Sequence, residues 1–363
     1  MAFGYLDNIG PIRFNRIISC FGSAQKAWKA SDQDWRRLGW GKIAEDFFSL
    51  KRKIDPDRCL KKLVASYCPP IWPIIKLDSY YPKNLLAIDD APAVLYSRGN
   101  SVTDLVNRRL ESWQSFWSSE ALAVVGTRRA TAYGRQITVR LSENLAQNGL
   151  IIVSGLARGI DTLAHQSALS VGGKTVAVLG SGVDVVYPAQ NRQLYQKILS
   201  RGIIFSELVP GTKPLPGHFP ARNRIISGLS LGVLVVEGGI KSGSLITASL
   251  AANQGREVLA IPGNITSQLS SGANYLIKNG AKMVTEVADV LEEFNLAPRK
   301  GSYIIGLDDE EKSVADLLAV QNMTIDEIVC QSGLETNRIS IILTKLEIKG
   351  IAVNLGLGQW GMK

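Results

Sequence analysis

Short apolar runs alternate with helical patterns along the middle of this 363-residue chain, and this alternation limits the possible folds more than any other feature. The predicted strands, each bounded by Gly, Ser or Pro, are 122–125, 150–153, 175–179, 203–205, 232–236 and 258–261. Between the first two, Ile137, Leu141 and Leu145 recur on one helix face. Continuous apolar strands that alternate with helices predict an α/β fold, a doubly wound parallel sheet covered on both faces.

The flanking segments have a different pattern, which divides the chain into three predicted domains. Residues 1–73 indicate a small helical domain, closed by three prolines between Pro69 and Pro73 that forbid helix. Residues 74–297 hold the sheet. Residues 308–363 contain three helical patterns, the last ending at Gly350, and a β-ribbon, which together predict a winged-helix domain. The linker between the last two domains is expected at 298–301.

Charge is unevenly distributed, with net values of +6 for residues 1–75, +7 for 76–307 and −4 for 308–363. A basic excess attracts polyanions such as nucleic acid, although a merely soluble basic surface is as compatible with charge alone. The chain has no apolar run long enough to span a membrane and no signal-peptide pattern at its start, so we expect a cytoplasmic protein without membrane contact. The four cysteines lack paired spacing and predict buried free thiols, with no metal site.

Several enzyme signatures nearly occur, and each fails in its context. Residues 168–175 lack the first glycine of a phosphate-binding loop and lead into a strand where that motif requires a helix. Residues 228–232 match a nucleophile-elbow string but precede a strand. The first two strands lack the glycine pattern and the acidic residue of a dinucleotide site. We therefore expect no catalytic residue and no cofactor.

The carboxyl ends of the predicted strands instead carry residues suited to anions. Gly126 and Arg128 follow the first strand, and a guanidinium fork fits phosphate oxygens. The strand that ends near Glu237 is followed by small donors around a predicted helix start: Ser242, Gly243, Ser244 and Thr247. Helix N-termini at this edge of an open sheet bind anions, so we predict a phosphate pocket here. A purely structural use of these glycines in tight turns is the alternative.

A second segment combines an aromatic residue with cations: Phe219 is followed within five residues by Arg222 and Arg224. Bases stack on exposed aromatic rings while neighbouring cations neutralise phosphates, which is the usual pattern for single-strand binding. Pro220 predicts an extended, loop-like Phe219. A core phenylalanine beside surface arginines is the alternative. Asp161 and His165, four residues apart on a predicted helix, indicate a structural hydrogen-bonded pair rather than a catalytic dyad.

Taken together, these segments resemble the bacterial DNA-processing protein A (DprA/Smf) family over about residues 120–290. The resemblance is carried by the runs Val125-Gly126-Thr127-Arg128, Ser154-Gly155-Leu156-Ala157-Arg158-Gly159-Ile160-Asp161, Phe219-Pro220-Ala221-Arg222-Asn223-Arg224, Ser242-Gly243-Ser244-Leu245-Ile246-Thr247 and Pro262-Gly263. Residues 237–239 depart from the family, which usually has alanine after the acid.

This resemblance implies a Rossmann-like sheet, an N-terminal domain of the SAM or helix-hairpin-helix type and a C-terminal winged helix. It implies a non-enzymatic protein that binds single-stranded DNA during natural transformation, protects it, and loads the RecA recombinase onto strands coated by single-strand-binding protein. It also implies a homodimer. Carried over to this chain, the phosphate pocket comprises Gly126, Arg128 and residues 242–244, with Phe219, Arg222 and Arg224 bordering the strand and Lys213 as a further contact.

Three questions stay open at the level of sequence. A nucleotide phosphoribohydrolase of the lysine-decarboxylase-like (LOG) type is the alternative function, although no glutamate follows the 237–247 loop in its predicted helix. The acidic winged helix is expected to contact protein or to bind duplex DNA weakly. Tyr275, Leu276 and Ile277 are the candidate dimer contact.

Overall fold

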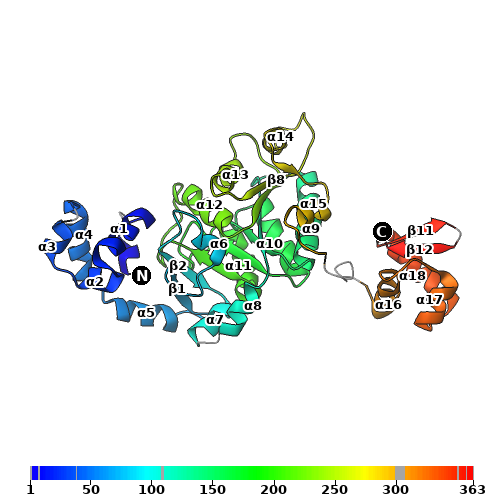
Figure 1. Cartoon of the computed structure of the whole chain (residues 1–363), viewed down its shortest axis with the longest axis horizontal. Coiled ribbons are helices and arrows are strands. Elements are labelled where there is room, and N and C mark those ends of the chain that lie inside the picture. Colours follow the sequence, from blue (N-terminus) through cyan, green and yellow to red (C-terminus); the bar gives the residue numbers. More distant parts are fainter. Residues whose placement is uncertain are drawn as a thin grey trace. The chain divides into compact units, whose positions relative to one another are not determined.

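The computed structural model describes residues 2–6, 9–37, 39–107, 110–298, 307–349, 351–356 and 358–362. The chain forms two compact units, Met1–Asn295 and Leu296–Lys363 (Figure 1). Arg299, Lys300 and Gly301 of the expected linker, and Gly350, lie outside the described residues. The proposed boundary at residue 73 falls within the first unit and stays a prediction.

The first unit begins with a group of short helices packed around aromatic rings. They are the 3₁₀ helix η1 (Ala2–Tyr5) and the helices α1 (Pro11–Phe21), α2 (Ala24–Lys29), α3 (Asp32–Arg36), α4 (Gly41–Lys51) and α5 (Pro56–Ala65). Gly22 ends α1 with a φ of 76°, and the Ser23 side chain caps α2 by accepting from the Lys26 amide. The Trp35 and Phe47 rings stack with their centroids 4.1 Å apart, so aromatic burial holds these helices together.

A nine-stranded sheet forms the centre of the first unit. Its order is β1-β2-β6-β5-β4-β3-β7-β8-β9, parallel from β6 to β9 and antiparallel at β1 and β2. The six predicted strands are confirmed, with ends within one residue of those expected: β3 (Ala121–Val125), β4 (Ile151–Ser154), β5 (Thr175–Val178), β6 (Ile203–Ser206), β7 (Gly232–Val235) and β8 (Glu257–Ala260).

Three strands at the sheet margins were not predicted: β1 (Ile71–Ile75), β2 (Val94–Arg98) and β9 (Lys282–Met283). Pro73 lies inside β1 and was interpreted only as a helix breaker. A proline is tolerated there because β1 is an edge strand that pairs on one side only.

Helices cover both faces of the sheet, as the doubly wound prediction requires. They are α6 (Lys83–Leu86), α7 (Asn100–Val106), α8 (Leu110–Phe116), α9 (Ala132–Gln147), α10 (Ile160–Ser170), η2 (Ala189–Asn191), α11 (Arg192–Arg201), α12 (His218–Gly228), α13 (Gly243–Asn253), α14 (Ser271–Lys278) and α15 (Val287–Glu293). Val176 and Val178 pack into one hydrophobic core and Ala177 into another. Alternate residues of one strand thus enter separate cores, which is how both sheet faces are buried.

The strand order reverses beside β3. From β3 the chain adds β4, β5 and β6 on one side, then returns to place β7, β8 and β9 on the other. The loops that follow β3 and β7 therefore diverge and leave a crevice at the carboxyl edge, which is the usual ligand position in such folds.

The second unit is a winged helix. It contains α16 (Asp309–Leu318), β10 (Met323–Thr324), α17 (Ile325–Ser332), α18 (Thr336–Ile348), β11 (Ala352–Gly356) and β12 (Gln359–Met362), with sheet order β10-β12-β11. Arg338 pairs with Glu310 at 2.6 Å, and Lys345 and Lys349 both pair with Glu311. The cations of α18 are therefore partly neutralised by the acids of α16.

The thiols differ from the sequence prediction. Cys20, Cys68 and Cys330 are exposed and Cys59 is half-buried, so the expectation of buried thiols was wrong, although all four are free.

Within the described ranges, no group of three or more His, Cys, Asp or Glu side chains is placed to hold a metal ion. None of the described helices is both long enough and apolar enough to cross a membrane.

Candidate nucleic-acid interface

A cavity of about 590 Å³ opens at the carboxyl ends of β3 and β7. It draws its lining from the loops after these strands and from α12 and α13, segments far apart in sequence. Eight of the ten predicted site residues line it: Gly126, Arg128, Phe219, Arg222, Ser242, Gly243, Ser244 and Thr247. Lys213 and Arg224 are not among the described lining residues.

The loop after β3 passes very close to its neighbours at Gly126. A Cβ at this position would lie 2.5 Å from the Ile160 side chain and 2.9 Å from the Glu237 carbonyl oxygen, so only glycine fits. The Thr127 amide donates to that same carbonyl at 2.7 Å. The next two residues, Arg128 and Arg129, are exposed at the cavity wall. Tight backbone docking thus presents two guanidinium groups to solvent.

The loop after β7 ends at the N-terminus of α13. Ser242 is its N-cap residue, yet in the described structure its side chain makes no capping bond with the helix backbone and instead pairs with the Ser244 hydroxyl at 2.7 Å. Gly238 lies beneath this pair, and a Cβ there would approach both hydroxyl oxygens to 2.5 Å. The Leu245 amide donates to the Ser242 carbonyl oxygen at 3.2 Å, whereas the Gly243 and Ser244 amides lie at the positive dipole end of the helix, which suits an anion.

Phe219 lies in the first turn of α12, so the prediction of an extended, loop-like Phe219 was wrong. A proline within the first helical turn loses no intrahelical hydrogen bond, and Pro220 therefore does not end this helix. The Phe219 ring is half-buried at the cavity. The Arg128 guanidinium carbon lies 5.6 Å from the ring centroid, so the two side chains are in cation–π contact.

Tyr187 is a lining residue for which the sequence analysis assigned no role. Its ring lies 5.5 Å from that of Phe219, and 44% of the residue is exposed. The available signal was an aromatic residue shortly after the Gly180-Ser181-Gly182 turn at the end of β5. Gly180 itself makes room for the Phe219 ring, since a Cβ there would lie 2.8 Å from it. Two aromatic faces therefore border the cavity.

Arg222 forms part of the cavity floor rather than an exposed border. Its guanidinium donates to the Gly155 carbonyl oxygen at 2.8 Å and to that of Val178, so it joins the ends of β4 and β5. Burial lowers the pKa of Arg222 to about 10, opposed by the nearby Asp161 carboxylate. Asp161 accepts from the Gly155 amide at 3.1 Å, and burial raises its pKa. The Arg222 guanidinium is therefore bonded mainly to protein groups rather than free to bind a ligand.

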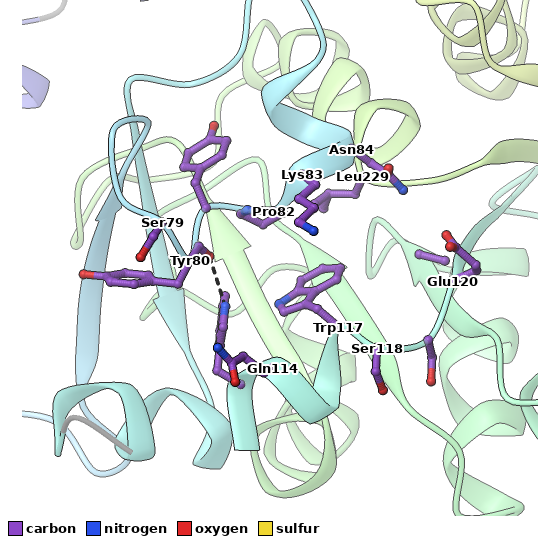
Figure 2. A pocket seen from close by; sticks show the side chains of 14 residues that line it. Ser79, Tyr80, Pro82, Lys83, Asn84, Gln114, Trp117, Ser118, Glu120 and Leu229 are labelled. Atoms are coloured by element: carbon purple, nitrogen blue, oxygen red, sulfur yellow. Dashed lines mark hydrogen bonds between the residues drawn. The ribbon is translucent and has the colours of Figure 1, made fainter. Parts of the chain in front are cut away.

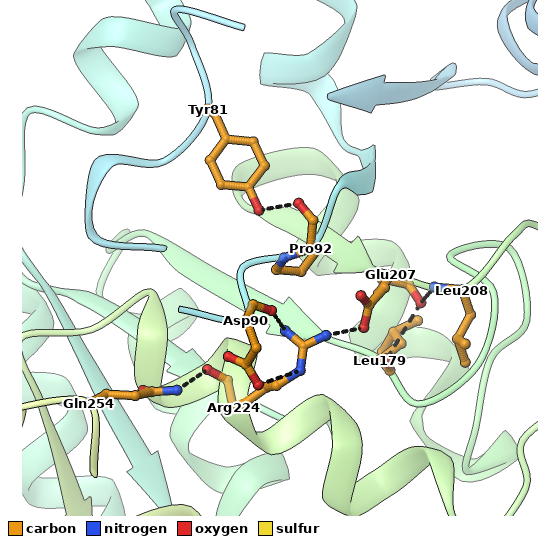
Figure 3. A network of polar contacts seen from close by, with 9 residues as sticks. Tyr81, Asp90, Pro92, Leu179, Glu207, Leu208, Arg224 and Gln254 are labelled. Carbon is orange, nitrogen blue, oxygen red and sulfur yellow. Dashed lines mark hydrogen bonds and ion pairs between the residues drawn. The ribbon is translucent and has the colours of Figure 1, made fainter. Parts of the chain in front are cut away.

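Arg224 lies outside the cavity in a network of its own (Figure 3). Its guanidinium donates to the Asp90 carbonyl oxygen at 2.7 Å, lies 3.4 Å from the Asp90 carboxylate and pairs with Glu207. Only 10% of the Arg224 side chain is exposed. Burial raises the pKa of Glu207, an effect that Arg224 opposes. Arg224 therefore links α12 to β6 and to the β1–β2 connection instead of bordering a ligand.

The Asp161–His165 hydrogen bond expected from the sequence is not formed. His165 Nδ1 lies 2.6 Å from the Thr175 hydroxyl, which itself donates to the Ile152 carbonyl oxygen. Nδ1 is therefore the donor, and Nε2 is buried without a hydrogen-bond partner among the described residues. Burial lowers the pKa of His165 to about 3, so the ring is neutral. Lys213 is exposed in the loop between β6 and α12.

The fold and the cavity define the class of protein to which this chain belongs. The chain is a Rossmann-like α/β protein with a crevice at the carboxyl edge of its sheet, lined by arginine and hydroxyl side chains, and it carries a winged helix. It belongs to the family of DNA recombination-mediator protein A, whose sequence model matches residues 72–295. Residues 301–356 match the DprA winged helix domain.

Curated relatives and solved structures agree with this family. The DNA processing protein DprA of Streptococcus pneumoniae is 47% identical over 218 residues, covering 60% of this chain and 72% of the relative. Protein Smf of Escherichia coli is 39% identical over 322 residues, 85% and 80% of the two chains. The X-ray structure of Streptococcus pneumoniae DprA matches with a TM-score of 0.60 at 37% identity, covering 78% of this chain and 98% of that one. DNA processing protein A of Helicobacter pylori, in a structure concerned with its single-stranded DNA binding mode, matches with a TM-score of 0.53 at 29% identity, over 62% and 95%.

Proposed function

We propose that this protein is a single-stranded DNA-binding recombination mediator, and that the cavity at the carboxyl edge holds the strand. The observation that carries the proposal is the convergence of an exposed guanidinium, two aromatic rings and the α13 N-terminus on one cavity. The Helicobacter pylori structure, which concerns single-stranded DNA binding by a related protein, supports it.

In this proposal the phosphates and the bases have separate contacts. Arg128 and the first-turn amides of α13 bind phosphate oxygens, with Gly126, Gly243 and the Ser242–Ser244 pair allowing the backbone to approach. Bases stack on Phe219 and Tyr187. Arg222 and Thr247 line the cavity and position these groups, whereas Arg224 stabilises the fold outside it. The exposed Lys213 is kept only as an outer contact with phosphate.

The finer parts of the function are proposed from the family. The family is described as a recombination mediator. We extend this, as the sequence resemblance implies, to loading of the RecA recombinase onto single strands covered by single-strand-binding protein during natural transformation. This work takes place in the cytoplasm and needs no catalytic turnover or cofactor. We propose a structural role for the buried His165 and Asp161, because their hydrogen-bond partners are backbone atoms and a strand hydroxyl.

We also propose a homodimer that forms through α13 and α14. A groove of about 510 Å³ between these helices is lined by Leu245, Ala248, Tyr275 and Leu276, and 50% of Tyr275 is exposed. Apolar exposure of this kind is typical of contact surfaces. Tyr275→Glu should convert a dimer to a monomer in light scattering at matched concentration, whereas an unchanged mass would place the contact elsewhere.

The test of the main function is a binding titration with a labelled oligonucleotide. Arg128→Ala should weaken binding to all sequences about tenfold and reduce the salt slope by about one. Arg201→Ala, which removes an exposed arginine at the end of α11 outside the cavity, serves as the control. Equal affinity of the Arg128 variant and the wild type across a salt series would contradict the proposal. Release of a free base from a nucleoside monophosphate by the wild type alone would favour the LOG-type alternative.

A further inference from the structure

A second cavity, of about 530 Å³, lies at the opposite edge of the sheet (Figure 2). Ala121 at the start of β3 lines this cavity, and Val125 at the end of the same strand lines the first one. The two positions are four residue steps apart along the strand, about 13 Å at ~3.3 Å per step. We call it the amino-edge cavity. It is lined by residues 79–84, 113–114 and 117–121 and by Leu229.

The walls of the amino-edge cavity are aromatic and preformed. Trp113 and Tyr80 line it together, joined by a hydrogen bond from the Trp113 indole to the Tyr80 carbonyl oxygen at 3.0 Å. Trp117 lies 6.0 Å from Trp113 and stacks on the buried Phe205 with an interplanar angle of 12°. Lys174 donates to the Ser115 carbonyl oxygen at 2.6 Å and so holds the end of α8 on the core. Trp113 is buried, whereas Trp117 and Tyr80 are half-buried and offer the ring surface that a ligand can meet.

The mouth of the amino-edge cavity carries charge. Lys83 begins α6 and is exposed, as is Glu120 before β3. Within the described part of the chain, neither side chain forms an ion pair. The Trp117 indole N–H is buried and has no hydrogen-bond acceptor among the described residues. A buried donor without an acceptor is costly, so a ligand atom that reaches it through a small shift of the ring gains stability.

We propose that the amino-edge cavity binds one unpaired nucleobase of a nucleic acid strand, with the adjoining phosphate on Lys83. A flat heterocycle stacks on the half-buried Trp117 and Tyr80 rings and offers ring nitrogens and carbonyl oxygens as acceptors. The net positive charge of residues 76–307 favours a polyanion over a neutral ligand. A base paired in a duplex presents no free face, which restricts the site to single strands.

This second site is independent of the first. The two cavities lie at opposite ends of β3, so a short oligonucleotide that fills one does not reach the other through the sheet. The cavity at the carboxyl edge binds phosphates through α13 and Arg128, whereas the amino-edge cavity binds mainly through stacking. Mutation of one should therefore leave the other able to bind.

The experiment uses the full chain carrying Arg128→Ala, which weakens the first cavity. A hexanucleotide containing 5-bromouracil is photo-cross-linked to the protein and the attached peptides are identified by mass spectrometry, while a fluorescence titration with hexathymidylate and with free thymidine monophosphate measures affinity. We expect cross-links on the peptide that carries Trp113 and Trp117. Adding Trp117→Leu should weaken binding about tenfold, and Lys83→Ala severalfold. Lys197→Ala, an exposed lysine outside both cavities, should leave binding unchanged.

The outcomes separate this proposal from the main function. Cross-links confined to Tyr187 and Phe219, with no effect of Lys83→Ala, would overturn the amino-edge site and leave the main proposal standing. Cross-links on the α8 peptide together with an unchanged affinity of Arg128→Ala would contradict the main proposal alone. Lys83 is exposed, so its variant tests the site even if Trp117→Leu disturbs packing against Phe205. Binding of the oligonucleotide but not the monophosphate would identify a strand as the natural source of the base.

Discussion

Gly134 in the first turn of α9 lies directly against the carboxylate of Glu237, and a Cβ at Gly134 would approach Oε2 to 2.1 Å. The same carboxylate accepts from the Thr131 amide at 3.0 Å and from its hydroxyl at 2.5 Å. Glu237 follows β7, whereas Thr131 ends the loop that carries Arg128. This contact therefore sets the position of the arginine loop relative to α13.

Gly134→Ala is expected to displace the Glu237 carboxylate and break both hydrogen bonds to Thr131. The free energy of unfolding should fall by about 2 kcal/mol, and single-stranded DNA affinity should fall with it. Chemical denaturation and an oligonucleotide titration measure the two effects. Gly41→Ala is the control, because within the described structure a Cβ there meets nothing within 4 Å. Wild-type affinity in Gly134→Ala would show that the loop is positioned by other contacts.

Tyr187→Leu is expected to weaken binding by about 1–3 kcal/mol, because it removes one aromatic face beside Phe219. The salt dependence should not change, since no phosphate contact is lost. This separates Tyr187 from Arg128, whose removal should alter the salt slope. A titration at several ionic strengths measures both quantities, and a reduced slope in Tyr187→Leu would contradict the stacking role.

Arg224→Met should destabilise the protein by about 3 kcal/mol, because it leaves Glu207 and Asp90 near a buried position without their cation. Adding Glu207→Leu should recover most of this loss. DNA affinity per folded molecule should stay at the wild-type value, because Arg224 does not line the carboxyl-edge cavity. Circular dichroism measures the folded fraction, and an oligonucleotide titration measures the DNA affinity. Weakened binding by a fully folded variant would show that Arg224 contributes to the DNA interface.

Stability should fall in mild acid because of His165. Its folded pKa of about 3 lies below its ordinary value of 6.5, so the unfolded state binds the proton more readily. The stabilisation is complete above pH 6.5 and is lost as pH falls, by about 2 kcal/mol at pH 5. His165→Leu should remove this slope in urea denaturation between pH 5 and 7. Asp161 has a raised pKa and the opposite sign, which is why the measurement stays above pH 5.

Removal of residues 308–363 should leave single-stranded DNA affinity within about twofold of the full chain. Arg338 and Lys345 are paired with Glu310 and Glu311, so the winged helix has few free cations for phosphates. A side-by-side titration of the full and shortened chains with single-stranded and duplex oligonucleotides measures this. Complete loss of single-strand binding would show that the strand is held mainly by the winged helix.

Local sequence patterns were sufficient for the strands that are buried on both faces. Each of β3 to β7 is a short, fully buried apolar run, and β8 is buried in its second half, so burial makes that signal strong. The margins were missed because an edge strand such as β1 tolerates Pro73 and one exposed face. The Gly126 and Ser242 loops were identified as cavity residues because their glycines and small hydroxyl side chains follow predicted strands, which local sequence specifies.

Sequence alone therefore determined the central strands β3 to β8, the two loops that line the cavity and the family resemblance. Only the tertiary structure decided which arginine is free for a ligand, since Arg128, Arg222 and Arg224 have equal charge but different surroundings: solvent, strand carbonyls and two partly exposed acids. It also placed Tyr187 beside Phe219 and formed an aromatic cavity at the other sheet edge. The reason is physical: backbone preferences are local, whereas the partner of a long side chain depends on segments distant in sequence.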